Sequence, residues 1–321
     1  MAIAVKINPK KIIPRIVALG AVAAVAWIFR DFIVEAAIQA INIGWGFFLL
    51  PLLFMGWSIP AVLGWRSFLL VTPRQSIPDM WRLLVIRFES LAVSFTVPSA
   101  GFGGDVLRTL LTREQQGGHS SAPPVVLDRI AFAGAETIVA FLGLTFYASR
   151  ATNGVVKLTA SFLGIVAFLF LIVMWRPVIT VIAKIPWAQK NAAVRKSMAT
   201  LLEIKAYRRA FFRSWGWHLF ERILMVGEIW LTAWLIGVRI GPVESLFSSA
   251  MATLFSVALF CFPAQLGAYE GGLVFAFSAL GEPAIAGLSI ALIRRARQLL
   301  VIGTGFLFLL FERSDKSQNS G

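Results

Sequence analysis

Two stretches of the sequence combine glycine, proline and an acidic residue within apolar surroundings. The first, residues 97–108, contains Gly103, Gly104, Asp105 and Arg108. A glycine-rich turn that opens a short helix presents unpaired N–H groups at the positive end of the helix dipole, which is a ready anion site. We therefore expect the two glycines to admit a phosphate, Asp105 to cap a helix that starts at residue 106, and Arg108 to lie one turn in. The alternative is that Asp105 and Arg108 only mark a water boundary.

The second stretch, residues 262–272, has a similar pattern. It contains Pro263, Gly267, Glu270 and Gly271. In both stretches the acid follows a proline by seven residues, since Asp105 follows Pro98 in the first. Proline and glycine interrupt helices, and inside a membrane such a break is tolerated only where it is buried in protein or lines a cavity. Paired breaks in the two halves of a membrane protein point to a transporter-like binding site, although two matched positions also fit chance.

Three arginines interrupt a further apolar segment, residues 284–311. They are Arg294, Arg295 and Arg297. An arginine at the centre of a bilayer costs about 2.5 kcal/mol or more, so such residues usually face a wet cavity or a partner. Arg294 and Arg297 are three residues apart and share a helix face. Their candidate partners are Glu270, Asp105 or a lipid phosphate, for which arginine offers a two-pronged donor.

A third group of ionisable residues follows a basic segment. His218, Glu221 and Arg222 fall within about one helical turn, and Glu228 lies seven residues after Glu221. A proton relay is one interpretation, because buried carboxylates and histidine can titrate near neutral pH. The other is an internally neutralised ion pair at the membrane interface. Glu136 has more apolar surroundings and is expected to face the interior of the bundle.

The elements that position these residues are predicted to be membrane helices. The chain has 321 residues, of which 58% are hydrophobic and 14% are charged, against roughly 45–50% apolar residues in soluble domains. A helix needs about 20 mainly apolar residues to cross a bilayer, and several windows of the sequence qualify. We predict an all-α integral membrane protein with about eight transmembrane helices. Two of its segments are expected to be re-entrant or broken. If the similarity between these two segments extends to the halves that contain them, the protein has an inverted repeat.

The expected spans are about 12–30, 38–71, 83–98, 130–149, 158–175, 214–238, 245–263 and 284–311. They form one polytopic membrane domain, residues 1–311, followed by a short polar cytoplasmic tail, residues 312–321. Nine basic residues and one acidic residue lie between positions 176 and 213, so the positive-inside rule places this segment and the basic N-terminus in the cytoplasm. The segment is either an amphipathic helix on the inner leaflet or a solvated loop. We expect a multi-pass protein of the cell inner (plasma) membrane.

Three motifs, taken in order, resemble the lysylphosphatidylglycerol synthase transmembrane, or flippase-domain, family. They are Gly103-Gly104-Asp105-x-x-Arg108, Leu127-Asp128-Arg129 and Pro263-x-x-x-Gly267-x-x-Glu270-Gly271. The resemblance covers nearly the whole chain and implies a helical membrane fold with re-entrant segments, linked to the translocation or handling of lipids with modified headgroups. With the arginines described above, it gives these candidate substrate-binding residues: Gly103, Gly104, Asp105, Arg108, Asp128, Arg129, Pro263, Gly267, Glu270, Gly271, Arg294 and Arg297.

The sequence departs from the family pattern at the late motif, where Tyr269 stands in place of an expected basic residue. The resemblance therefore does not imply a local arginine–glutamate pair there. The family also contains chains fused to a cytosolic aminoacyl-transferase domain. The sequence ends ten residues after Phe311, so we expect a stand-alone member without that domain and do not carry the synthase activity over.

These features favour lipid translocation, that is, flippase-like transport of a phospholipid or of a headgroup-modified or polyprenyl-type lipid. The alternatives are a membrane-embedded enzyme, with Asp105 or Glu270 as its acid or base, and an accessory subunit in lipid or lipid-linked glycan modification. The expected partners are membrane lipids with anionic headgroups and no nucleic acid; a lipid-modifying enzyme partner and a homo-oligomer stay open. Two histidines and one cysteine give no metal-site pattern, and no nucleotide-binding or hydrolase motif occurs, so we expect no metal, no cofactor and no catalytic residue.

Overall fold

The computed structural model describes residues 30–44, 46, 49–71, 77–96, 102–115, 122–150, 204–259 and 267–318. The helices are α2 (Arg30–Ile41), α3 (Leu49–Leu69), α4 (Met80–Thr96), α5 (Phe102–Gln115), α6 (Ala122–Arg150), α10 (Ile204–Leu235), α11 (Pro242–Ala258), α12 (Ala268–Ala279) and α13 (Ala284–Gln318). No strand occurs in these described ranges, so the predicted all-α class is confirmed. The expected span 158–175 and Pro263 lie outside the described residues, as does all but the last residue of the span 12–30.

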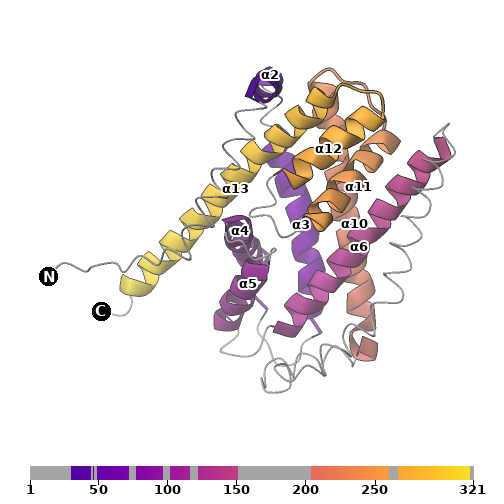
Figure 1. Ribbon diagram of the computed structural model, residues 1–321. Helices are drawn as coiled ribbons and strands as arrows, with labels where there is room; N and C mark the ends of the chain where they lie inside the picture. Colours follow the sequence, from indigo (N-terminus) through magenta and orange to yellow (C-terminus); the bar gives the residue numbers. More distant parts are fainter. Residues whose placement is uncertain are drawn as a thin grey trace, which may run out of the picture.

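The helices form one bundle with two main apolar cores. In the bundle, α3 packs against α10 and α6, while α13 packs against α4, α12 and α2 (Figure 1). The first core joins α3, α4, α5 and α6 around the fully buried Trp65 and Ile86. The second joins α10, α11, α12 and α13 around Leu273 and Phe277, which are also fully buried. Each core therefore contains one short helix, α5 in the first and α12 in the second.

Both short helices are second arms of helical hairpins. Helix α5 has 14 residues and packs on α4, whereas α12 has 12 residues and packs on α11. At about 1.5 Å per residue they are about 21 Å and 18 Å long, shorter than a hydrocarbon core of about 30 Å. Figure 1 shows them toward opposite ends of the bundle. Both stretches that the sequence analysis identified as breaks therefore separate helices.

Glycine permits the close approach of each short helix to its neighbour. A Cβ on Gly104 would lie 2.2 Å from the carbonyl oxygen of Ser90 in α4. A Cβ on Gly272 would lie 2.6 Å from the Cα of Ala252 in α11. Both distances are shorter than van der Waals contact, so a larger residue at either position would push the two helices apart.

The structure divides the single span expected at 38–71. Helix α2 ends at Ile41 and α3 begins at Leu49. Gly44, between them, has a φ of 57°, a left-handed conformation that glycine adopts without steric cost. Helix α3 then continues through Pro60. None of the helices in the described residues is both long enough and apolar enough to count as a membrane span.

We predict that Gly272→Ala lowers the free energy of unfolding by about 1–3 kcal/mol, because the added methyl group overpacks the contact between α11 and α12. The matched control is Gly303→Ala in α13, where a Cβ would meet nothing within 4 Å. That change removes backbone freedom from the unfolded chain and is expected to be neutral or slightly stabilising. Thermal unfolding of the purified proteins in detergent, followed by tryptophan fluorescence, measures both. Equal destabilisation by the two changes would contradict this account of the contact.

Candidate functional site

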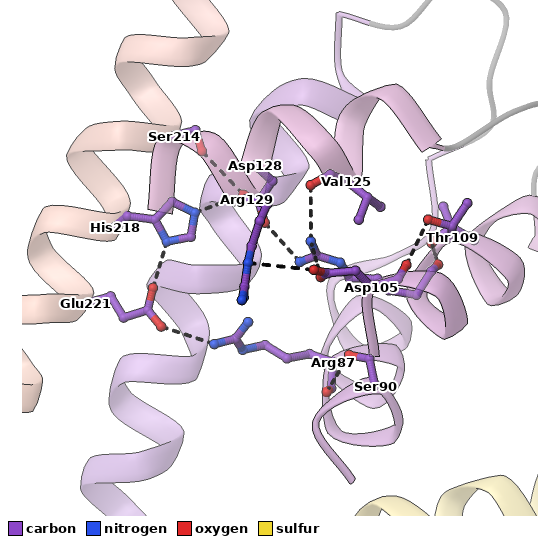
Figure 2. A network of polar contacts seen from close by, with 12 residues as sticks. Arg87, Ser90, Asp105, Thr109, Val125, Asp128, Arg129, Ser214, His218 and Glu221 are labelled. Carbon is purple, nitrogen blue, oxygen red and sulfur yellow. Dashed lines mark hydrogen bonds and ion pairs between the residues drawn. The ribbon is translucent and has the colours of Figure 1, made fainter. Parts of the chain in front are cut away.

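Six ionisable side chains converge around α5 and form one continuous network, which we call the α5 charge network. Its members are Arg87 from α4, Asp105 and Arg108 from α5, Asp128 from α6, and His218 and Glu221 from α10. Figure 2 labels all of them except Arg108, and the labelled side chains point toward one another from four helices. Ion pairs thus join the α4–α5 hairpin to α6 and α10.

Asp128 lies at the centre of the α5 charge network. Its Oδ2 accepts a hydrogen bond from Nη1 of Arg108 at 2.9 Å, and its Oδ1 lies 2.9 Å from Nε2 of His218. The Ser214 hydroxyl donates to the same Oδ1 at 3.4 Å. Arg108 also contacts Asp105 at 3.3 Å, one turn earlier in α5. Because the Asp128 side chain is only 3% exposed, these partners replace the water that its charge would otherwise need.

His218 links Asp128 to a second carboxylate. Its Nδ1 lies 2.7 Å from Oε2 of Glu221, and Oε1 of Glu221 accepts a hydrogen bond from Nη2 of Arg87 at 3.1 Å. Each ring nitrogen therefore faces a carboxylate oxygen. When both carboxyl groups are ionised, both hydrogen bonds form together only if each nitrogen carries a proton, that is, if the ring is the imidazolium. With that charge the α5 charge network contains three cations and three carboxylates.

The imidazole ring is held tightly by uncharged neighbours. Gly64 of α3 lies against it, and a Cβ at this position would be 3.0 Å from Nε2 of His218. The Phe132 ring of α6 contacts the imidazole edge to face, with ring centroids 5.5 Å apart. His218 as a residue is 1% exposed. Its position is therefore fixed by close packing as well as by hydrogen bonds.

A second group of charged pairs surrounds α12. Glu270 of α12 accepts hydrogen bonds from Arg295 of α13 at 2.5 Å and 3.3 Å. Nη1 of Arg297 donates to Glu228 of α10 at 2.7 Å. These contacts attach α12 and α10 to α13, as the α5 charge network attaches α5 to α6 and α10.

Arg294 has a different environment from its neighbours. Its guanidinium lies 3.9 Å from the centroid of the Tyr269 ring and donates a hydrogen bond to the Tyr269 hydroxyl. Among the described residues no carboxylate forms an ion pair with Arg294. A small pocket beside it is lined by Glu228, Ile229, Thr232, Tyr269, Ile290, Ile293 and Arg294. Arg294 is thus a cation beside a small pocket that Glu228 also lines, with the Tyr269 hydroxyl as its hydrogen-bond partner.

Trp57 of α3 lies between the two groups. The guanidinium carbon of Arg87 is 6.0 Å from the centroid of its ring, and that of Arg297 is 5.3 Å away. Both distances are within the range of a cation–π interaction. The ring, from a residue that is 5% exposed, therefore connects one arginine of the α5 charge network with one arginine of the second group.

The structure brings together four of the residues predicted in the first half of the chain: Asp105, Arg108, Asp128 and Arg129. Arg129 is the most exposed of them, at 43%, and its Nε lies 3.8 Å from Asp105. The expectation that Asp105 caps a helix starting at residue 106 is wrong. Helix α5 begins at Phe102, so Asp105 lies in its first turn and pairs with Arg108.

The four predicted glycines lie at or near the N-termini of α5 and α12. Gly103 lies in the first turn of α5, and Gly104 packs against the α4 backbone. Gly267 has a φ of 81° and precedes α12, where its N–H donates to the Glu270 carboxylate at 3.0 Å. A Cβ on Gly271 would lie 3.6 Å from the Phe255 ring, an ordinary contact distance.

The partners expected for the α13 arginines are different in the structure. Glu270 contacts Arg295, whereas Arg294 contacts Tyr269 and Arg297 contacts Glu228. Sequence reasoning also missed Arg87, although a charge inside the apolar segment 83–98 was the signal that could have found it. His218 and Glu221 were recognised as neighbours, but their joint contact with Asp128 was not expected. The contact between His218 and Asp128 joins residues that are 90 positions apart in the sequence.

A family model described as lysylphosphatidylglycerol synthase TM region matches residues 13–305. The chain belongs to this family. The resemblance carried by the three sequence motifs is thereby confirmed. No curated protein and no solved structure gives a significant match. The lysylphosphatidylglycerol synthase TM region is a membrane-domain family, which associates the chain with lipid modification or transport.

In this member of the lysylphosphatidylglycerol synthase TM-region family, charged groups of the described residues contact one another closely. No cluster of three or more potential metal ligands occurs in the described residues. Both nitrogens of His218 are engaged by carboxylates. What the arrangement offers chemically is a buried proton-binding ring and, at Arg294, a cation that can bind an anionic oxygen.

We predict that Asp128→Asn lowers the free energy of unfolding by roughly 3–5 kcal/mol, because Arg108 and His218 would then face a neutral amide inside the protein. The matched control is Asp31→Asn. Its ion pair with Arg30 is exposed, with side-chain exposures of 92% and 57%, and such pairs contribute about 0–1 kcal/mol. Chemical unfolding in detergent measures both changes. A loss for Asp128→Asn no larger than that of the control would contradict a central role for this carboxylate.

Proposed function

We propose that the protein moves lipids with anionic headgroups between the leaflets of the cell inner membrane, without changing them covalently. The observation that carries this proposal is the pair of short helices, α5 and α12, toward opposite ends of one bundle (Figure 1). Each is the second arm of a hairpin, and each is held by arginine–carboxylate pairs. Paired broken segments in the two halves of a membrane protein are typical of transporters whose substrate site lies between the repeats.

The headgroup contact is proposed for Arg294, which has no ion pair within 4.0 Å among the described residues, and for Arg129, which lies 3.8 Å from Asp105. Arg108 and Arg297 are buried and closely paired with Asp128 and Glu228. Arg294 has the Tyr269 hydroxyl as its polar partner, and Arg129 is half-exposed. A guanidinium binds phosphate oxygens in two-pronged geometry. We therefore assign the lipid phosphate to Arg294. Arg129, whose side chain is more exposed, is assigned as a second contact.

The proposed orientation places the N-terminus and the basic segment 176–213 in the cytoplasm, following the positive-inside rule. These residues lie largely outside the described part of the chain, so sequence alone supports this orientation. A cysteine introduced at Lys196, after replacement of Cys261, is expected to react only with reagents that reach the cytoplasmic side. Labelling of that cysteine by an impermeant reagent from outside intact cells would contradict the orientation.

Leaflet exchange in proteoliposomes tests the proposed activity. The probe is fluorescent phosphatidylglycerol, quenched from outside by a membrane-impermeant reductant. Wild-type protein is expected to make the inner-leaflet probe accessible while the recovered lipid stays chemically unchanged. Formation of a new lipid product would instead indicate an enzyme. If neither exchange nor a new lipid product is observed, an accessory subunit is the remaining interpretation. That outcome would overturn the proposal.

We predict that Arg294→Gln weakens the apparent affinity for the phosphatidylglycerol probe about ten- to hundredfold, because a charge-assisted contact of roughly 1.5–3 kcal/mol is lost. The matched control is Arg209→Gln, which removes an exposed arginine from α10. The concentration dependence of exchange is measured for both variants. Equal affinities for Arg294→Gln and the control would exclude Arg294 as the phosphate contact.

A further inference from the structure

Arg222 of α10 is a buried cation with one ion-pair contact among the described residues. Its side chain is 8% exposed, and its Nη1 lies 3.1 Å from Oε1 of Glu136 in α6. The buried Nε of Arg222 has no hydrogen-bond acceptor in the described part of the chain. A charged donor that is left without an acceptor inside a protein costs free energy. An anionic oxygen bound beside Glu136 would therefore be stabilised by donors that the ion pair leaves unused.

The Phe132 ring of α6 links Arg222 to the more exposed Arg129. The guanidinium carbon of Arg222 lies 4.2 Å from the ring centroid, and that of Arg129 lies 5.4 Å from the same centroid. Both distances are within the range of a cation–π interaction. Arg129, Phe132 and Glu136 are spaced by three and four residues, so they form one stripe along α6. This stripe extends from Arg129, which is 43% exposed, to the ion-pair partner of Arg222.

Arg222 lies between the two arginines that are proposed to bind the lipid phosphate. Arg129 pairs with a carboxylate of α5, whereas Arg294 donates a hydrogen bond to a hydroxyl of α12. Figure 1 shows α5 and α12 toward opposite ends of the bundle. The negative charge of Glu136 also acts on Arg294. The pair of Arg222 and Glu136 thus adjoins Arg129 through Phe132 and lies within electrostatic reach of Arg294.

The two members of this ion pair differ in how easily each can leave it. Glu136 is 27% exposed, whereas Arg222 is 8% exposed and packed on Phe132. A partly exposed carboxylate that gives up an ion pair keeps water as an alternative partner, so its release costs little. A buried guanidinium has no such alternative and needs another anion. A phosphate oxygen in place of the carboxylate would preserve the charge balance around Arg222.

We propose that Arg222 is a third contact for the lipid phosphate, between Arg129 and Arg294, and that Glu136 competes with the phosphate for it. The ligand is a phosphate diester anion, whose oxygens match the paired N–H donors of a guanidinium. Binding exchanges one anion for another at Arg222, with no covalent change. The contact rests on the proposed translocation, because it divides the passage between the other two phosphate contacts into two shorter steps.

Binding of short-chain phosphatidylglycerol to the purified protein in detergent, measured by phosphorus-31 NMR titration, tests the contact without translocation. The background carries Arg129→Gln and Arg294→Gln, so that the remaining binding reports on Arg222. Arg222→Gln is expected to weaken binding about tenfold or more, because a charge-assisted contact is lost. Glu136→Gln is expected to strengthen it by up to about fivefold, because the competing carboxylate is lost.

An ion pair with only a structural role predicts that Arg222→Gln and Glu136→Gln change binding in the same direction or leave it unaltered. Either result, or no binding in this background, would overturn the proposal. The matched controls are Glu35→Gln and Arg209→Gln, which remove exposed charges from α2 and α10 and are expected to leave binding unaltered.

A double variant keeps the test independent of whether the single variants fold. Glu136→Gln combined with Arg222→Gln removes one charge of each sign and is expected to bind as weakly as Arg222→Gln alone. Binding restored to that of the background protein would assign the pair a structural role and refute the contact. Glycerol phosphate, which has no acyl chains, distinguishes a free phosphate from a lipid and is expected to bind more weakly than the lipid. Equal affinities would refute the lipid as the ligand of this site.

Exchange of fluorescent phosphatidylglycerol in proteoliposomes separates this proposal from the proposed function. Opposite effects of the two single changes on binding, in a protein that exchanges no lipid, would support the Arg222 contact and refute translocation. Lipid exchange by the wild-type protein, with equal effects of the two changes on binding, would refute the contact and leave translocation standing.

Discussion

The Asp128 carboxylate is the group on which the arrangement of the first half of the bundle depends. One of its oxygens binds Arg108 of α5 and the other binds His218 of α10, so a single side chain of α6 joins three helices. Removing three charged groups from water is costly, and the pairing recovers that cost only when the geometry is met. A buried network of this kind therefore specifies how the helices fit together more than it adds stability. It also makes the fit of these helices sensitive to the charge of each member.

Close packing and charge act together at both short helices. Gly104 lets α5 approach α4, and Gly272 lets α12 approach α11. Arg108 then secures α5 through Asp128, while Glu270 secures α12 through Arg295. The two halves thus share three structural features: a helical hairpin, a glycine where its two helices cross, and a buried or half-buried ion pair. The halves differ in one respect, because among the described residues an imidazole occurs in the α5 charge network alone.

The sequence was informative about the breaks and the family, and less so about the partners. Proline and glycine near Asp105 and Glu270 predicted interrupted helices because they act on the local backbone. The pairing of Arg87 with Glu221 joins residues separated by 134 positions, which no local pattern encodes. The choice of Arg295 over Arg294 for Glu270 depends on how α13 is rotated against α12. Side-chain spacing gives the faces of one helix, but only packing decides which face meets which neighbour.

The central claim is that a doubly protonated His218 joins Asp128 of α6 to Glu221 of α10 inside the α5 charge network. Nitrogen-15 NMR of histidine side chains, in protein labelled at histidine and carrying His119→Gln to leave one signal, tests it most directly. The account predicts that at neutral pH both ring nitrogens of His218 are bonded to hydrogen. A neutral ring with one unprotonated nitrogen at that pH would contradict it.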